Sequence, residues 1–190
     1  ILEAISFYSN SSNEREFCYD LSLDKSFSYA DFNDNINRCA NFINSLPSDK
    51  PKIISSAIGN SIEGLIIFFA AQKVGAAINP MPNSLSENEI LRNLEFLNPD
   101  VIFLEKTQMS NNFKDHKIVY VDMEQRNFLD ILCQYPRENT FFPNRDDIAA
   151  LYYTSGTTSD PKCMEYSHNS QIKLIDSISH SFAFNEADIF

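Results

Sequence analysis

The sequence predicts an α/β fold in which a mostly parallel sheet is flanked by helices on both faces. Short apolar runs alternate along the chain with segments whose apolar residues recur at helical spacing. Several of the short runs are apolar throughout, which is typical of strands buried on both sides. The chain has 190 residues, 43% hydrophobic and 13% aromatic, enough for a packed core in one large domain or two small ones.

Capping signals support the helices. The segments expected to be helical are about 29–46, 61–74, 86–97, 125–133 and 168–181. Ser28 with Asp31, and Ser86 with Glu89, have the spacing of capping boxes at two of the starts. Gly75 follows the second helix, in the position where a left-handed residue ends many helices.

The expected strands lie between these helices. They are residues 52–58, 76–79, 101–104, 117–121 and 148–153, and residues 17–28 are expected to form a hairpin that turns at Asp24 and Lys25. The order after the hairpin is mainly strand and helix in alternation, which requires crossover connections and therefore favours parallel pairing.

Charge and cysteine usage exclude several classes of protein. The net charge is −11 and no cluster of Lys and Arg is present, so we expect neither nucleic acid nor an anionic membrane as a partner. The most apolar run, residues 65–71, is far shorter than the about 20 residues of a membrane span. The four cysteines form no C-x-x-C pair, so no metal site is expected, and scattered thiols with no visible signal peptide favour the cytoplasm.

The stretch YYTSGTTSDPK, residues 152–162, carries the strongest chemical signal. It follows a buried strand, and in parallel sheets ligands bind beyond the carboxyl ends of strands. Its candidate anion-binding residues are Thr154, Ser155, Gly156, Thr157, Thr158 and Lys162. Gly156 allows close approach of the backbone, and each donor to a charged acceptor is worth roughly 1.5–3 kcal/mol. The spacing is not that of a Walker loop, and the alternative interpretation is a surface turn rich in Ser and Thr.

The longer stretch YYTSGTTSDPKCMEYSH resembles the phosphate-binding signature of the adenylate-forming enzymes, Tyr-Thr-Ser-Gly-Thr-Thr-Gly-x-Pro-Lys-Gly followed by Thr-His. SFSYADFNDNINRCANFI, AAQKVGAAINPMPNSLSENEILRNLEFLNPDVIF and RDDIAALYYTSGTT resemble further segments of that family, in the right order. The family includes acyl-CoA and aryl-CoA ligases, luciferases and peptide-synthetase adenylation domains. VGAAINPMPNSLSENEI looks more like the acyl-CoA ligase branch, which includes enzymes of fatty acid metabolism.

The resemblance implies a reaction in two steps. A carboxylate attacks the α-phosphorus of ATP, bound with Mg²⁺, and releases pyrophosphate; a thiol, often that of coenzyme A, then takes the acyl group. By this resemblance the six loop residues hold the β- and γ-phosphates. His168 matches the family's histidine near the acyl pocket, and its other interpretation is a capping residue of the last helix. His116 and His180 match nothing and are expected to be surface or packing residues.

Two glycines of the signature are missing. Ser159 stands where the second glycine belongs, and Cys163 stands where a glycine follows the lysine. If position 159 needs a left-handed backbone, a serine there costs about 1–2 kcal/mol. Asp160 and Glu165 add negative charge near a site for anions. These changes are expected to weaken the loop rather than abolish its function.

Family members run several hundred residues further. We therefore expect residues 1–190 to form a partial N-terminal AMP-binding domain, without the later ribose-binding and mobile C-terminal parts, and to be inactive alone. The alternatives are a degenerate, non-catalytic relative that serves as a binding or interaction domain, and an amino-acid adenylation domain of the peptide-synthetase type. The sequence names neither the carboxylic acid nor the oligomeric state.

Overall fold

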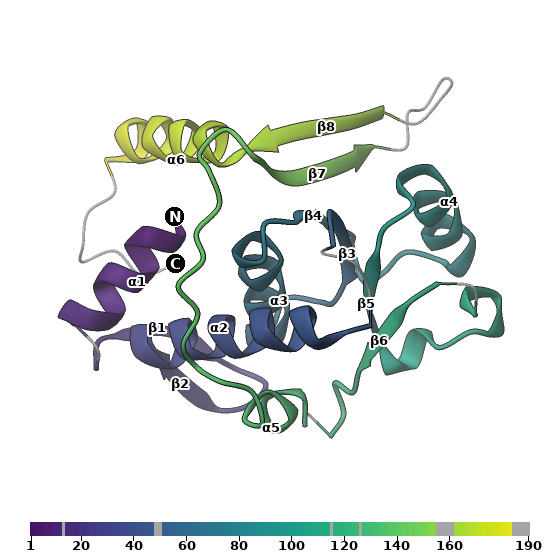
Figure 1. Ribbon diagram of the computed structural model, residues 1–190, viewed down its shortest axis with the longest axis horizontal. Helices are drawn as coiled ribbons and strands as arrows, with labels where there is room; N and C mark the ends of the chain where they lie inside the picture. Colours follow the sequence, from purple (N-terminus) through teal and green to yellow (C-terminus); the bar gives the residue numbers. More distant parts are fainter. Residues whose placement is uncertain (13, 48–50, 115, 126, 155–161, 184–190) are drawn as a thin grey trace.

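The computed structural model describes residues 1–12, 14–47, 51–114, 116–125, 127–154 and 162–183. Its centre is a six-stranded sheet with the strand order β6-β5-β3-β4-β7-β8 (Figure 1). The strands are β3 (Ile53–Ala57), β4 (Ala77–Pro80), β5 (Val101–Glu105), β6 (Ile118–Val121), β7 (Ile148–Thr154) and β8 (Lys162–Ser167). All neighbours pair in parallel except β8, which runs antiparallel to β7. The predicted fold class is confirmed.

Helices and a hairpin surround this sheet. They are α1 (Leu2–Ser11), β1 (Glu16–Asp20), β2 (Lys25–Ser28), α2 (Tyr29–Ser45), α3 (Ile62–Lys73), α4 (Glu87–Leu97), α5 (Phe128–Leu132) and α6 (His168–Phe182), with short 3₁₀ turns η1 (Lys106–Gln108) and η2 (Asn111–Phe113). Figure 1 shows α2 and α3 on one side of the central strands and α4 on the other. None of the helices in the described ranges is long and apolar enough to cross a bilayer.

Strand β5 shows how the sheet is buried on both faces. Val101 and Phe103 belong to the core under α2, α3 and α5, whereas Ile102 and Leu104 belong to the core under α4. All four side chains have no solvent exposure. Successive side chains of a strand point to opposite faces, so a strand between two layers of helices must be apolar throughout. This accounts for the continuous apolar runs of the sequence.

The five predicted helices are confirmed, although α5 is shorter than expected. Both capping boxes form: the Ser28 hydroxyl accepts from the Asp31 N–H at 3.1 Å, and the Glu89 carboxylate accepts from the Ser86 N–H at 2.8 Å. Gly75 follows α3 with φ of 81°, in the left-handed region that favours glycine.

Helix α1 and strand β8 were not predicted. The segment from Lys162 to Ser167 turns back along β7 in an antiparallel register. Its side chains are all half-buried or exposed, so it carries no apolar signal. Backbone pairing with β7, which a pattern of side chains does not reveal, makes it a strand.

The buried carboxylate of Asp20 joins the β1–β2 hairpin to α3. One oxygen accepts from the N–H groups of Ser22 at 2.9 Å and Leu23 at 3.0 Å, and the other accepts from the N–H of Ile62 at 3.2 Å. Asp20 is 8% exposed. The same side chain therefore closes the hairpin turn and caps the first turn of a buried helix.

The variant Asp20→Asn should lower the free energy of unfolding by about 2 kcal/mol, because an amide NH₂ replaces one acceptor oxygen and faces backbone donors. Asp24→Asn is the matched control: Asp24 is exposed with φ of 51°, a conformation that Asn tolerates, so the change should stay within about 0.5 kcal/mol. Urea unfolding measures both. Equal effects of the two variants would contradict the role given to Asp20.

Candidate functional site

The carboxyl ends of β3, β4 and β7 lie at one edge of the sheet because these strands are parallel. Strand β7 ends at this edge with Thr154. Thr154 ends β7 and pairs with Lys162, the first residue of β8, so the two ends of the loop are held side by side. The side chain of Lys162 is exposed. The predicted anion-binding residues Ser155, Gly156, Thr157 and Thr158 lie outside the described residues, as does Ser159.

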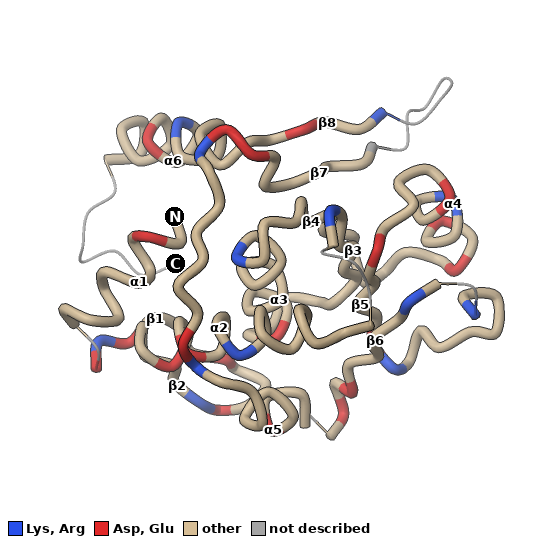
Figure 2. The backbone as a smooth tube through the Cα atoms, viewed as in Figure 1, with Lys and Arg blue, Asp and Glu red and all other residues tan. Residues whose placement is uncertain are grey.

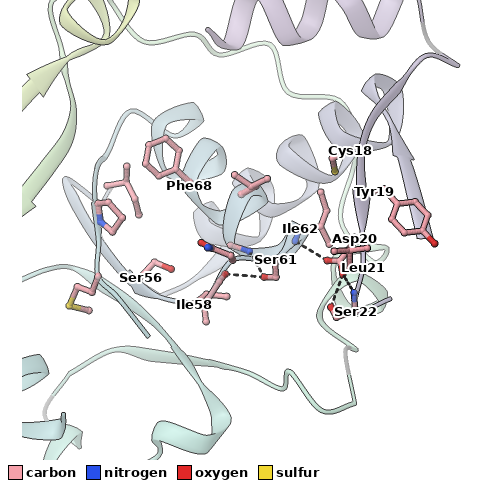
Figure 3. A pocket seen from close by; sticks show the side chains of 17 residues that line it. Cys18, Tyr19, Asp20, Leu21, Ser22, Ser56, Ile58, Ser61, Ile62 and Phe68 are labelled. Atoms are coloured by element: carbon pink, nitrogen blue, oxygen red, sulfur yellow. Dashed lines mark hydrogen bonds between the residues drawn. The ribbon is translucent and has the colours of Figure 1, made fainter. Parts of the chain in front are cut away.

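A cavity of about 550 Å³ opens at the same edge (Figure 3). Its walls come from the β1–β2 hairpin, the first turns of α3 and the residues that end β3 and β4. Figure 3 shows Asp20 and Ser22 on the hairpin side and Ser56 and Phe68 on the other. Most of the lining is apolar, and the described residues that form it include neither Lys nor Arg. This volume lies in the range of sites that hold small molecules.

A second cavity, of about 240 Å³, continues toward β7. It shares Pro80 and Met81 with the larger cavity, and its other walls are Pro82, Leu85, Glu89, Arg92, Asn93 and Tyr153. Tyr153 lies one residue before Thr154, so the smaller cavity reaches the end of β7. The two cavities together are called the hollow. No local sequence pattern reveals this hollow, because residues from several separate segments build it.

Buried amides fix one wall of the smaller cavity. Asn79 Nδ2 donates to Asn93 Oδ1 at 2.7 Å and to Ser55 Oγ at 3.0 Å, and all three residues are buried. Such a network holds the side chain of Asn93 in one orientation. Polar residues within the apolar strands 52–58 and 76–79 were the signal in the sequence that could have pointed to this network.

Hydrogen bonds to Glu105 hold the turn after β3 in place. Glu105 Oε1 accepts from Gly59 N at 3.0 Å and from Asn83 Nδ2 at 3.1 Å. A Cβ atom on Gly59 would lie 2.6 Å from Asn83 Nδ2, so a larger residue at this position would displace that amide from Glu105. These hydrogen bonds fix the positions of residues around the hollow.

Electrostatics favour the loop over α3 as the place for an anion. The N-terminus of α3 already holds the carboxylate of Asp20, which would repel a second anion there. Lys162 is the basic residue that the β7–β8 hairpin brings to the loop. The charges of the chain are otherwise spread over many elements, as Figure 2 shows.

Cys163 is a packed thiol. It lies in β8 and pairs with Tyr153 of β7, and its pKa is raised by burial and by the neighbouring Glu165 carboxylate. A raised pKa keeps the thiol protonated and weakens it as a nucleophile. This agrees with the interpretation of Cys163 as a structural replacement for glycine. All four cysteines are free.

His168 lies at the other end of the hairpin from the loop. Ser167 pairs with Ile148 at the start of β7, and His168 begins α6 directly afterwards. The N-cap of α6 is Ser167, whose hydroxyl accepts from the Ser170 N–H at 3.1 Å, so the interpretation of His168 as the cap is wrong. His168 is buried, and burial lowers its pKa. Its role near an acyl pocket stays a prediction.

The low pKa of His168 predicts a pH dependence. Below its ordinary pKa of 6.5 the unfolded chain binds a proton more readily than the folded chain, so stability falls as the pH drops through that value. His168→Gln should make the loss of stability between pH 7.5 and 5.5 smaller. Urea unfolding at the two pH values checks this; an unchanged loss in His168→Gln would refute it.

No group of three or more His, Cys, Asp or Glu side chains capable of holding a metal ion occurs in the described part of the chain.

Curated relatives fall into two classes. One of the proteins that make up the linear gramicidin synthase of Brevibacillus parabrevis is 22% identical over 88% of this chain, which covers 2% of that protein. The crotonobetaine/carnitine–CoA ligase of Escherichia coli is 28% identical over 75% of this chain, which covers 31% of the ligase. The chain thus spans less than a third of the length of these relatives.

Solved structures share the fold. The complex of VinN with 3-methylaspartate superposes with a TM-score of 0.84 at 14% identity, and covers 98% of this chain and 52% of that one. The o-succinylbenzoate CoA synthetase of Bacillus subtilis, in complex with its acyl-adenylate intermediate, gives 0.81 at 19% identity, over 97% and 47% of the two chains. The AMP-binding enzyme family matches residues 8–190, and the chain belongs to this family of adenylate-forming enzymes.

Proposed function

We propose that residues 1–190 form the N-terminal part of an ATP-dependent ligase that activates a carboxylic acid as an acyl-adenylate and then transfers the acyl group to the thiol of coenzyme A, with release of AMP. The observation that carries the proposal is the pairing of Thr154 with Lys162 next to Tyr153, which lines the smaller cavity at the carboxyl ends of the parallel strands. Family membership supports the use of ATP. The free thiols are consistent with a reducing compartment such as the cytoplasm.

In the first step a carboxylate oxygen attacks the α-phosphorus of ATP and pyrophosphate leaves. We assign the hydroxyl and N–H groups of residues 154–158 to donate to the β- and γ-phosphates, and the ammonium of Lys162 to offset the charge of the leaving group. Fixed donors aimed at developing charge lower the barrier of such a step. Mg²⁺, when bound, neutralises phosphate charge, and it takes phosphate oxygens and water as ligands more readily than a protein cage.

An amino-acid adenylation domain is the second candidate, because a gramicidin synthase is among the relatives. The third is a non-catalytic relative, which Ser159 and Cys163 favour. ATP–pyrophosphate exchange in the full-length protein, with fatty, aryl and amino acids in separate reactions, distinguishes the three. Exchange with a fatty or aryl acid supports the ligase, exchange with an amino acid supports the adenylation domain, and a folded protein silent with every acid supports the non-catalytic relative.

Lys162→Met should reduce the rate of this exchange by about tenfold to a hundredfold, because a charge-assisted contact to the leaving phosphates is lost. Lys173→Met, at an exposed position of α6, is the matched control and should leave the rate unchanged. Equal rates in the two variants would remove Lys162 from the phosphate site. The 190 residues alone should bind ATP weakly in calorimetry.

Ser159→Gly should raise the rate of exchange by roughly fivefold to thirtyfold, if the loop needs a left-handed backbone there, since serine then costs about 1–2 kcal/mol. Ser170→Gly, in the first turn of α6, serves as the control for a serine-to-glycine change outside the loop. A rate that falls in Ser159→Gly would show that the serine itself contributes to the site.

A further inference from the structure

Lys73 is a buried cation whose charge is balanced by no acidic side chain of the described ranges. It is the last residue of α3 and is 3% exposed. In the part of the chain that the structure describes, its ammonium has neither a hydrogen bond nor an ion pair, and its contact is with the ring of Phe142, whose centroid lies 3.6 Å from Nζ. Burial lowers the pKa of Lys73 to about 8. An unpaired buried ammonium is costly, and a cation–π contact offsets only part of that cost.

A cavity of about 400 Å³ lies beside this lysine. Its lining residues are Asn44, Lys73, Val74, Glu138, Asn139, Thr140 and Phe141. They come from the ends of α2 and α3 and from the segment that connects α5 to β7, which Figure 1 shows passing along these helices. Lys73 therefore lines a space whose other walls include apolar surface from Val74 and Phe141.

The far wall of this cavity is held in place by hydrogen bonds. Asn41 Nδ2 donates to the carbonyl oxygens of Pro136 at 2.8 Å and Glu138 at 3.1 Å. Asn139 Nδ2 donates to Asn41 Oδ1 at 3.0 Å, and its own Oδ1 accepts from Phe141 N at 3.1 Å. Helix α2 thus fixes the connecting segment over Lys73, and the cavity is formed before any ligand enters.

The charges around the cavity fit a ligand with one negative charge. Glu138 lies at its mouth, with a side chain that is 78% exposed and 3.6 Å from the guanidinium of Arg137. It makes no contribution to the pKa of Lys73, which is lowered by burial alone. A monoanion on Lys73 would be neutralised, whereas a phosphate dianion would leave excess charge close to the carboxylate of Glu138.

We propose that this cavity binds a small organic carboxylate, with the carboxylate group on Lys73 Nζ and the apolar body against Val74 and Phe141. The site lies near the amino end of β4, which follows Lys73 by four residues, and so at the opposite edge of the sheet from the loop 155–161. It is therefore separate from the site of the proposed ligase reaction. The proposal does not depend on that reaction.

The test is an NMR titration of the lysine side chains of the full chain with benzoate and with uncharged benzamide. Benzoate should raise the pKa of Lys73, because a bound anion favours the charged amine, and benzamide should leave it unchanged. Lys73→Met should weaken benzoate binding about tenfold or more. Lys173→Met, at an exposed lysine, is the matched control and should bind benzoate as the unchanged protein does.

Two further measurements make the outcome decisive. Phe141→Ala should weaken benzoate binding roughly threefold to tenfold through lost apolar contact. Inorganic phosphate should change the pKa of Lys73 less than benzoate at equal concentration. If saturating benzoate does not change the pKa of Lys73, the proposal is wrong, and this test holds even if Lys73→Met fails to fold. If phosphate changes the pKa of Lys73 more than benzoate does, the assignment to carboxylates is wrong.

Discussion

The burial of β3 and β5 on both faces is the constraint on which the rest of the structure depends. Ile54 in β3 and all of residues 101–104 in β5 are shielded from water, and each large side chain of this kind contributes about 1.5–3 kcal/mol. Helices that join parallel strands cover both faces of a sheet, here α3 and α4 on opposite faces. Parallel strands bring their carboxyl ends to one edge. The hollow at that edge is a consequence of this arrangement.

The distribution of charge follows from the same arrangement. At the carboxyl edge, Asp20 occupies the N-terminus of α3, and we propose that phosphate binds instead at the hairpin that carries Lys162. At the opposite edge, the segment before β7 covers the end of α3. The charged side chain of Lys73 is therefore buried, in contact with Phe142. The chain is acidic overall, but a lysine lies near a cavity at each edge: Lys162 near the smaller cavity at the carboxyl edge, and Lys73 in the lining of the cavity at the opposite edge. Local charge, rather than net charge, decides what each edge can bind.

Most of the fold could be predicted from the sequence, because its elements carry local signals. Capping boxes, Gly75 and continuous apolar runs each depend on residues within one turn or one strand. For the site, the local signals in the sequence point only to residues 154–158 and Lys162, and their role stays a prediction. The sequence does not reveal that the charged side chains of Asp20 and Lys73 are buried. The groups that they contact lie about 40 and 70 residues away along the chain, so no local pattern connects them. Strand β8 was missed because its half-exposed side chains carry no pattern.

The two departures from the family signature are not equivalent. Cys163 replaces a glycine, but it lies in β8, where it pairs with Tyr153 in extended backbone that any residue adopts. No left-handed conformation is needed, and the side chain packs as a protonated thiol. The change at position 163 therefore carries no backbone strain. If the serine and cysteine together reduce activity, the loss must come from Ser159, within the loop. A single restored glycine at 159 should then be sufficient, and a glycine at 163 would weaken the strand that holds the loop closed.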